Sequence, residues 1–130
     1  MKKWIILLLS VMMIAGCGQE KEKDREAVYM NITAQEAKVI MDSQEDYTIL
    51  DVRTQEEYDQ GHIPGAILIP DYEIEEKAEQ VLQDKDQLLL VYCRSGRRSK
   101  LAAEALVALG YTNIKEFGGI IDWPYEVVKP

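Results

Sequence analysis

The chain has 130 residues, which is room for one ordinary domain, and 47% of them are hydrophobic, which is enough to fill a core. It carries 23 acidic and 15 basic side chains, a formal net charge of -8 at pH 7, and this balance argues against a nucleic-acid-binding surface. The charge does not identify a partner, and a solubilising surface explains it equally well.

The first 17 residues, MKKWIILLLSVMMIAGC, are typical of a signal peptide. Two lysines are followed by an apolar stretch at 5–15, interrupted only by Ser10 and well short of the roughly 20 residues that a membrane-spanning helix needs. The end of the stretch, IAGC, resembles the bacterial lipobox, in which a small residue precedes a lipidated cysteine. That resemblance implies cleavage after residue 16, lipid on Cys17 and an extracytoplasmic protein held to a bacterial membrane. An uncleaved anchor helix is the alternative.

Residues 17–27 are predicted to form the lipidated cysteine and a charged tether. Seven consecutive charged side chains of mixed sign stand at 20–26, with nothing apolar to bury, so this stretch is expected to be solvated. The folded domain is then expected over 28–130.

The chain has two cysteines, Cys17 and Cys93, and one histidine, His62. If Cys17 carries lipid, Cys93 has no intramolecular partner, so no disulfide is expected in the domain. One cysteine and one histidine do not make a normal ligand set, so we expect no metal site and no cofactor.

From residue 28 onward, short apolar runs alternate with helical segments. The strands expected are, in chain order, 28–32, 47–52, 66–69, 87–92 and 113–117. The helices expected between them are 33–43, 54–58, 71–83 and 99–110, followed by a glycine-rich turn with a helical piece over 118–127. Two helix starts carry Thr-x-x-Glu capping boxes, at Thr33 and Thr54.

This alternation predicts an α/β domain of about one hundred residues, with a parallel sheet covered on both faces. The run QLLLVY at 87–92 is apolar on both faces of a strand, which suits a central position. Sites in such sheets form at the carboxyl ends of the strands.

Cys93 stands at such an end, in LLLVYCRSGRRS, between the most apolar strand and a helix. Backbone N–H groups and the helix N-terminus are expected to point at its sulfur, with arginines 94, 97 and 98 close by. This arrangement favours the thiolate over the thiol, and Gly96 suits a loop that curls tightly around an anion. A buried structural cysteine is the alternative.

Three stretches in order resemble a single-domain rhodanese, a sulfurtransferase module: LDVRTQEEYDQGHIPGAILIP, VYCRSGRRS and FGGIIDW. The resemblance covers nearly all of 28–130. It implies a five-stranded parallel sheet with helices on both faces, and an active-site loop that cradles a persulfide on the cysteine.

Carried over by position, the resemblance makes Cys93 the nucleophile and sulfur carrier. The substrate-binding loop would consist of Arg94, Ser95, Gly96, Arg97 and Arg98. Of these, Arg98 is expected to help hold the anionic group of a sulfur donor, with Arg94 and Arg97 as weaker candidates.

Four further residues of the matched stretches receive supporting roles. Asp51 and Arg53 are expected to support the loop and the end of the sheet, and a structural ion pair is the alternative for them. His62 is expected to be a fold residue of its turn, and Trp123 to cap the core beside the loop.

The implied reaction is a double displacement: Cys93 takes sulfur from a donor such as thiosulfate and passes it to a thiol or cyanide. A thiolate that is already ionised requires no general base, so none is expected. Two alternatives stay open. One is a cysteine phosphatase, whose cradle is one residue longer between cysteine and arginine than the stretch from Cys93 to Arg98. The other is a non-catalytic or sensing binding module on the same fold. The sequence identifies no protein partner.

Overall fold

The computed structural model of the protein describes residues 28–130. The predicted signal peptide at 1–16 and the tether at 17–27, with Cys17, lie outside the described residues. Within the described part, no helix has the length and apolar character to cross a membrane.

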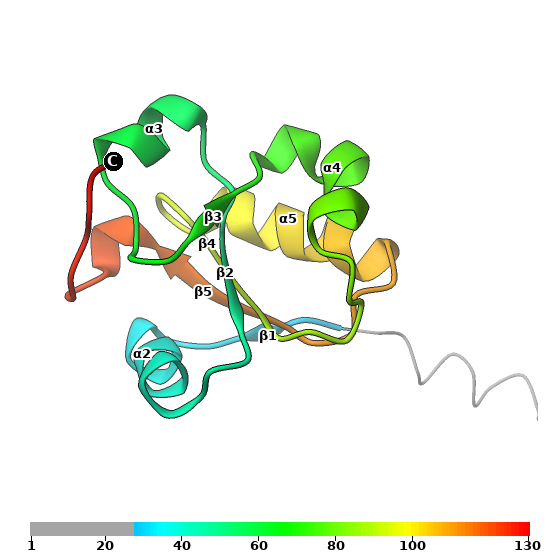
Figure 1. Ribbon diagram of the computed structural model, residues 1–130, viewed down its shortest axis with the longest axis horizontal. Helices are drawn as coiled ribbons and strands as arrows, with labels where there is room; N and C mark the ends of the chain where they lie inside the picture. The colour runs from blue at the N-terminus through cyan, green and yellow to red at the C-terminus, as the bar shows by residue number, and fades with distance from the viewer. Residues whose placement is uncertain (1–27) are drawn as a thin grey trace, which may run out of the picture.

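The predicted five-stranded parallel sheet is confirmed, and its strand order is β1-β5-β4-β2-β3 (Figure 1). The strands are β1 (Met30–Asn31), β2 (Thr48–Asp51), β3 (Ile67–Leu68), β4 (Leu89–Cys93) and β5 (Ile114–Gly119). The most apolar strand, β4, is central, and all five of its residues are buried. The carboxyl ends of the parallel strands lie together at one edge, where sites form in sheets of this kind.

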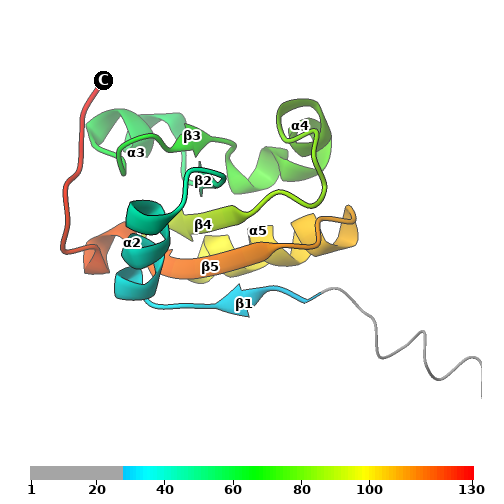
Figure 2. The same cartoon turned by 60° about the horizontal axis from the view of Figure 1, so that its bottom comes forward.

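Helices cover both faces of the sheet, as predicted, and Figure 2 shows α2 on the near face and α5 behind β4 and β5. The helices are α2 (Ala34–Ser43), α3 (Gln55–Gln60), α4 (Ile74–Val81) and α5 (Arg97–Ala108), with 3-10 turns η1 (Asp71–Glu73) and η2 (Ile120–Asp122). Two apolar clusters result, one between the sheet and α4 with α5, the other between the sheet and α2.

Alternation along β4 decides which way the cysteine points. Leu89, Val91 and Cys93 belong to the cluster under α4 and α5, whereas Leu90 and Tyr92 belong to the cluster under α2. Side chains two apart in a strand share a face, so the sulfur of Cys93 is directed toward α5.

Both predicted capping boxes are present. Thr33 accepts from Glu36 N at 3.1 Å, and Thr33 N donates to the Glu36 carboxylate at 3.2 Å. The Thr54 box repeats the pattern with Glu57, at 3.2 and 3.3 Å. Each box satisfies backbone donors that a helix start leaves without partners, which is why the sequence marks these starts so clearly.

Two predicted boundaries next to Cys93 were wrong. The helix α5 begins at Arg97 rather than at residue 99, because Gly96 adopts a φ of 102° and turns the chain directly into the helix. Strand β5 continues through Gly119 rather than ending at 117. Val91 pairs with Glu116 and Cys93 with Gly119, so β5 carries one extra residue, a bulge, opposite the end of β4.

The chain beyond η2 is not helical over the range expected. Its residue Val128 instead forms an isolated antiparallel bridge with His62. This bridge holds the C-terminal segment against the turn that precedes β3.

A buried polar network ties β2 to β4. Asp51, fully buried, pairs with Arg53 at 2.7 Å and accepts a hydrogen bond from the Tyr92 hydroxyl at 2.7 Å. Tyr92 in turn accepts from Ile63 N at 3.1 Å, and the Arg53 guanidinium donates to the Gly61 carbonyl at 2.7 Å. Burial, and then the charge of Asp51, raises the pKa of Tyr92. The network fixes the residue immediately before Cys93.

We predict that Tyr92→Phe lowers the free energy of unfolding by about 1–3 kcal/mol, because it leaves the buried N–H of Ile63 without its acceptor and removes one donor from the Asp51 carboxylate. Urea unfolding measures the change. Tyr72→Phe is the matched control, since Tyr72 is 71% exposed and its hydroxyl loss should change stability little. Equal stability changes in the two variants would contradict the importance of the network.

Candidate active site

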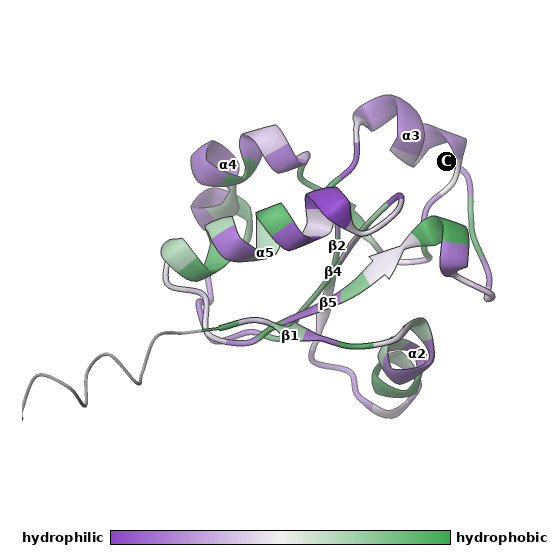
Figure 3. Ribbon diagram, turned by 180° about the vertical axis from the view of Figure 1, so that it is seen from behind, coloured by the Kyte–Doolittle hydropathy of each residue, from purple (hydrophilic) through white to green (hydrophobic). Residues whose placement is uncertain are grey.

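The candidate site is centred on Cys93, the last residue of β4, whose side chain is fully buried. The loop that follows curls back over the sulfur, so that Gly96 N donates to Cys93 Sγ at 2.9 Å. The first turn of α5 starts immediately after Gly96, and Figure 3 shows that this turn is strongly hydrophilic. One backbone donor therefore meets the sulfur just before the helix start, where several were expected from the sequence.

The loop fits only because Gly119 lies beneath it. A Cβ built on Gly119 would stand 1.9 Å from the Arg94 carbonyl oxygen, far inside any real contact. The same carbonyl accepts a hydrogen bond from Ile121 N at 3.2 Å. The Cys93 loop therefore packs directly against the end of β5.

The arginines near Cys93 are placed differently from one another. Arg98 forms a bidentate pair with Glu57 of α3, with nitrogen–oxygen distances of 2.6 and 2.8 Å. Arg94 and Arg97 are exposed, and among the described residues neither forms an ion pair. The Glu57 partner was not predicted from the sequence. Arg98, which was expected to hold the anionic group of a donor, is already neutralised by a carboxylate.

The pair changes the ionisation of both partners. Hydrogen bonds from Arg98 lower the pKa of Glu57 to about 2, and hydrogen bonds to Glu57, with its charge, raise the pKa of Arg98 against the opposing effect of burial. A negative charge on Cys93 adds a smaller part to the rise in the pKa of Arg98.

Two residues that the sequence did not single out complete the surroundings of the sulfur. Ser99 Oγ lies 3.3 Å from Cys93 Sγ and 2.6 Å from Glu116 Oε1, and Gly118 N donates to the same carboxylate oxygen at 2.9 Å. Glu116 is only 2% exposed. The sequence held a sign of this position, because Glu116 comes two residues after Ile114 and so shares its buried face of β5. A carboxylate is unusual on such a face.

The remaining predicted residues lie around this centre. Asp51 and Arg53 form the ion pair that the sequence left as an alternative, and they reach Cys93 only through Tyr92. His62 stacks on Tyr58 with ring centroids 3.8 Å apart, within its turn. Trp123, 8% exposed, packs against Phe117 and Tyr125 as part of the core.

A hollow of about 490 Å³ opens beside the loop. It is lined by Arg53, Glu57, Gln60, Gly61, Arg94, Ile120, Ile121 and Val127. Since Arg94 adjoins Cys93 and Glu57 holds Arg98, this hollow gives small molecules an approach to the loop.

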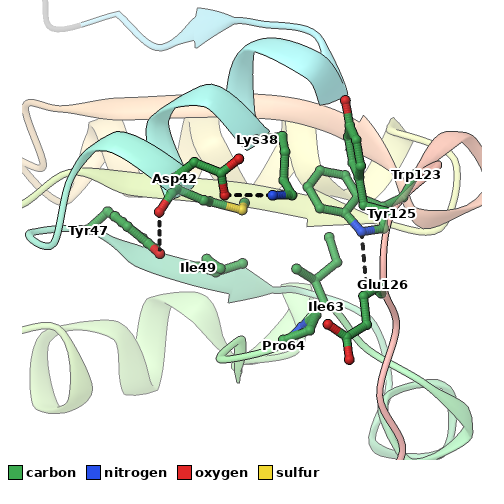
Figure 4. A pocket seen from close by; sticks show the side chains of 10 residues that line it. Lys38, Asp42, Tyr47, Ile49, Ile63, Pro64, Trp123, Tyr125 and Glu126 are labelled. Carbon is green, nitrogen blue, oxygen red and sulfur yellow. Dashed lines mark hydrogen bonds and ion pairs between the residues drawn. The ribbon is translucent and has the colours of Figure 1, made fainter.

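A second, smaller cavity of about 200 Å³ lies between α2 and the C-terminal segment (Figure 4). Four of its polar side chains already have partners: Lys38 pairs with Asp42, the Tyr47 hydroxyl donates to the Met41 carbonyl, and Trp123 Nε1 donates to the Glu126 carbonyl. None of its lining residues belongs to the Cys93 loop. Within residues 28–130, no group of three or more metal-ligating side chains is arranged around a common point.

The architecture and the site together define one class of protein, a parallel five-stranded α/β domain with a cysteine loop at the end of its central strand. The sequence profile described as the rhodanese-like domain matches residues 33–124, and the chain belongs to that family.

Among curated relatives, the thiosulfate sulfurtransferase PspE of Escherichia coli is 41% identical over 80 residues, which cover 62% of this chain and 77% of that protein. The putative sulfur carrier protein YrkF of Bacillus subtilis is 36% identical over 107 residues, 82% of this chain but only 57% of that protein. Sulfurtransferases are therefore among the relatives of this chain.

Solved structures give the same family. An Escherichia coli structure described as rhodanese with anions is 39% identical, with a TM-score of 0.61, and the match covers 65% of this chain and 99% of that one. A rhodanese-like domain protein from Staphylococcus aureus is 32% identical, with a TM-score of 0.66, over 78% of this chain and 98% of that one.

The Glu57–Arg98 pair predicts a pH dependence of stability. The folded-state pKa of Glu57, about 2, lies below the ordinary 4.5, so the pair stabilises the fold above pH 4.5 and is lost as the pH falls toward 2. The free energy of unfolding of the wild type should therefore fall more steeply across this window than that of Glu57→Gln. Glu56→Gln, at the exposed neighbouring position, should keep the steep fall. Identical slopes for all three proteins would contradict the assignment.

Proposed function

We propose that the protein moves sulfane sulfur from a donor such as thiosulfate to a thiophilic acceptor through a persulfide on Cys93. The observation that carries the proposal is the backbone N–H of Gly96 directed at Cys93 Sγ from 2.9 Å, at the carboxyl end of the central strand. Relatives named as sulfurtransferases support the same reaction.

In the proposed first step, the Cys93 thiolate attacks the outer sulfur of the donor, the sulfur–sulfur bond of thiosulfate breaks, and sulfite leaves with the electron pair. Cys93 then carries one extra sulfur as a persulfide. In the second step, a thiol or cyanide takes that sulfur and the Cys93 thiolate leaves. Both sulfur forms are anionic, so a backbone donor fixed at the sulfur stabilises each without having to reorganise.

The other residues of the site bind the donor, shape the loop or support it. Arg94 and Arg97 are exposed and available to the sulfonate end of the donor. Arg98 is held and neutralised by Glu57, so it does not serve as a mobile anion ligand. Ser95 and Gly96 shape the turn of the loop, and Asp51 with Arg53 supports it through Tyr92.

The substrate approaches from the hollow beside Arg94 in this proposal. Because Cys93 has no exposed surface, sulfur transfer requires the loop to open from the described conformation. The exposed side chains of Ile121 and Val127 line the same hollow, so the acceptor meets an apolar wall as well as arginine.

We predict that thiosulfate adds the mass of one sulfur atom to the Cys93 peptide of the full-length protein, and that a thiol or cyanide removes it. Mass spectrometry of the digested protein measures both steps. Cys93→Ser should gain nothing, because a serine hydroxyl is a poor nucleophile at neutral pH, while Cys17→Ala should load normally. If the wild type stays unmodified by sulfane donors but hydrolyses aryl phosphates, the phosphatase alternative replaces this proposal. If it does neither, the binding-module alternative replaces it.

We propose further that Cys17 carries lipid and holds the domain outside the cytoplasm on a bacterial membrane. The support is the sequence alone: a charged start, a short apolar stretch and the lipobox-like IAGC.

Labelled palmitate should enter the wild-type protein and Cys93→Ala but not Cys17→Ala, and Cys17→Ala should leave the membrane fraction or accumulate as an uncleaved precursor. Incorporation of label, read from gels of cell fractions, tests this directly. Label in Cys17→Ala equal to that in the wild type would show that the lipobox interpretation is wrong.

A further inference from the structure

The hydroxyl of Ser99 is crowded by four potential partners. Its oxygen lies 2.6 Å from Glu116 Oε1, 3.1 Å from the Gly96 carbonyl, 3.3 Å from Cys93 Sγ and 3.4 Å from the Gly118 carbonyl. A hydroxyl has one proton to donate, and the shortest contact, to a carboxylate, takes it. Ser99 therefore offers Cys93 a lone pair rather than a proton.

A lone pair at the sulfur favours the protonated thiol, because a thiol can donate to it and a thiolate cannot. In the described arrangement Cys93 Sγ donates to Ser99 Oγ. This opposes the effect of the Gly96 N–H, which favours negative charge on the sulfur. A thiol proton needs a destination when the sulfur attacks a donor, whereas the thiolate expected from the sequence required no base.

We infer that Glu116, acting through Ser99, takes the proton of Cys93 when the sulfur attacks its donor. The inference rests on the proposed sulfur transfer, since that reaction is what the proton movement would serve. Its geometry is given by the Cys93–Ser99 and Ser99–Glu116 contacts. The Sγ–H proton passes to Ser99 Oγ while the Ser99 proton passes to Glu116 Oε1. The result is a thiolate, a neutral serine and a protonated carboxyl, so charge and protons balance.

The same movement reverses the hydrogen bonds at the sulfur. Once Glu116 is protonated it donates to Ser99, and the Ser99 proton turns toward the thiolate or the inner sulfur of the persulfide. The thiolate then gains a second donor besides Gly96 N–H. When the acceptor removes the outer sulfur, Cys93 leaves as a thiolate and Glu116 returns the proton along the same path.

Glu116 is suited to this role by its surroundings. It is 2% exposed, and no described cation forms an ion pair with it. Its hydrogen-bond donors are Ser99 Oγ at 2.6 Å and Gly118 N at 2.9 Å. Among the neighbouring titratable groups, the charges of Glu104 and Glu116 both act on Tyr29, and that of Cys93 acts on Arg98. Arg98 is the only cation among these groups, and it is paired with Glu57 rather than with Glu116.

The test compares Glu116→Gln with the full-length wild type in the rate of sulfur uptake from thiosulfate across pH. The amide oxygen of Gln can still accept from Ser99 but cannot take its proton. At neutral pH the variant should load about 100-fold more slowly, the usual contribution of a positioned base, and the gap should close as the pH rises and solvent removes the proton. Ser99→Ala should show the same gap that narrows with pH.

Glu104→Gln is the matched control, since it removes one exposed carboxylate from α5, the helix that carries Ser99, and should follow the wild-type profile. Thermal unfolding checks that all variants fold. A Glu116→Gln variant that loads faster at low pH would mean that Glu116 acts only by repelling the thiolate, and this would overturn the inference. A gap of equal size at every pH would mean a structural role and would overturn it as well.

Alkylation of the Cys93 peptide by iodoacetamide, measured on the same variants, separates the two proposals because it needs deprotonation but no sulfur donor. If the wild type takes no sulfur yet Glu116→Gln shows the pH-dependent gap in alkylation, the sulfur-transfer proposal fails and the proton path stands. If sulfur loads normally and neither rate depends on Glu116, the proton path fails and the sulfur transfer stands.

Discussion

The loop from Cys93 to Gly96 lies directly on the end of β5, and the contact is so close that residue 119 must lack a side chain. This constraint orders everything around the sulfur. It sets the bulge that pairs Cys93 with Gly119, and it brings the Gly96 N–H to the sulfur. It also carries the buried carboxylate of Glu116, three residues before, under the first turn of α5. The fold thus builds the site from backbone contact between two central strands rather than from long flexible side chains.

The electrostatics of the site follow from that backbone arrangement. Three arginines follow Cys93 closely in the sequence, yet Arg98 is bound to Glu57 of α3, and the other two are exposed. Around the sulfur itself, a backbone N–H favours negative charge and a serine lone pair favours the thiol. In the proposed reaction, such a site passes from thiol to thiolate by moving one proton, and it stabilises the persulfide formed with the donor's sulfur by reorienting one hydroxyl.

Much of the fold could be predicted from the sequence because its signals are local. The capping boxes at Thr33 and Thr54 and the doubly apolar β4 each depend on a few neighbouring residues, and together they placed Cys93 at the end of a central strand. The start of α5 was missed because it depends on a positive φ at Gly96, which the loop contact imposes. The Glu57–Arg98 and Ser99–Glu116 contacts were missed because they join residues 41 and 17 positions apart, and only packing brings these together.

The central claim is that the loop on β5 is a cradle for sulfur bound to Cys93. A crystal structure of the protein after exposure to thiosulfate tests it most directly. The account predicts density for one extra atom bonded to Cys93 Sγ, enclosed by the loop, with Gly96 N still within hydrogen-bonding distance of Sγ. An unmodified Sγ beside intact thiosulfate, or a loop that unfolds from β5 to leave the sulfur in solvent, would contradict it.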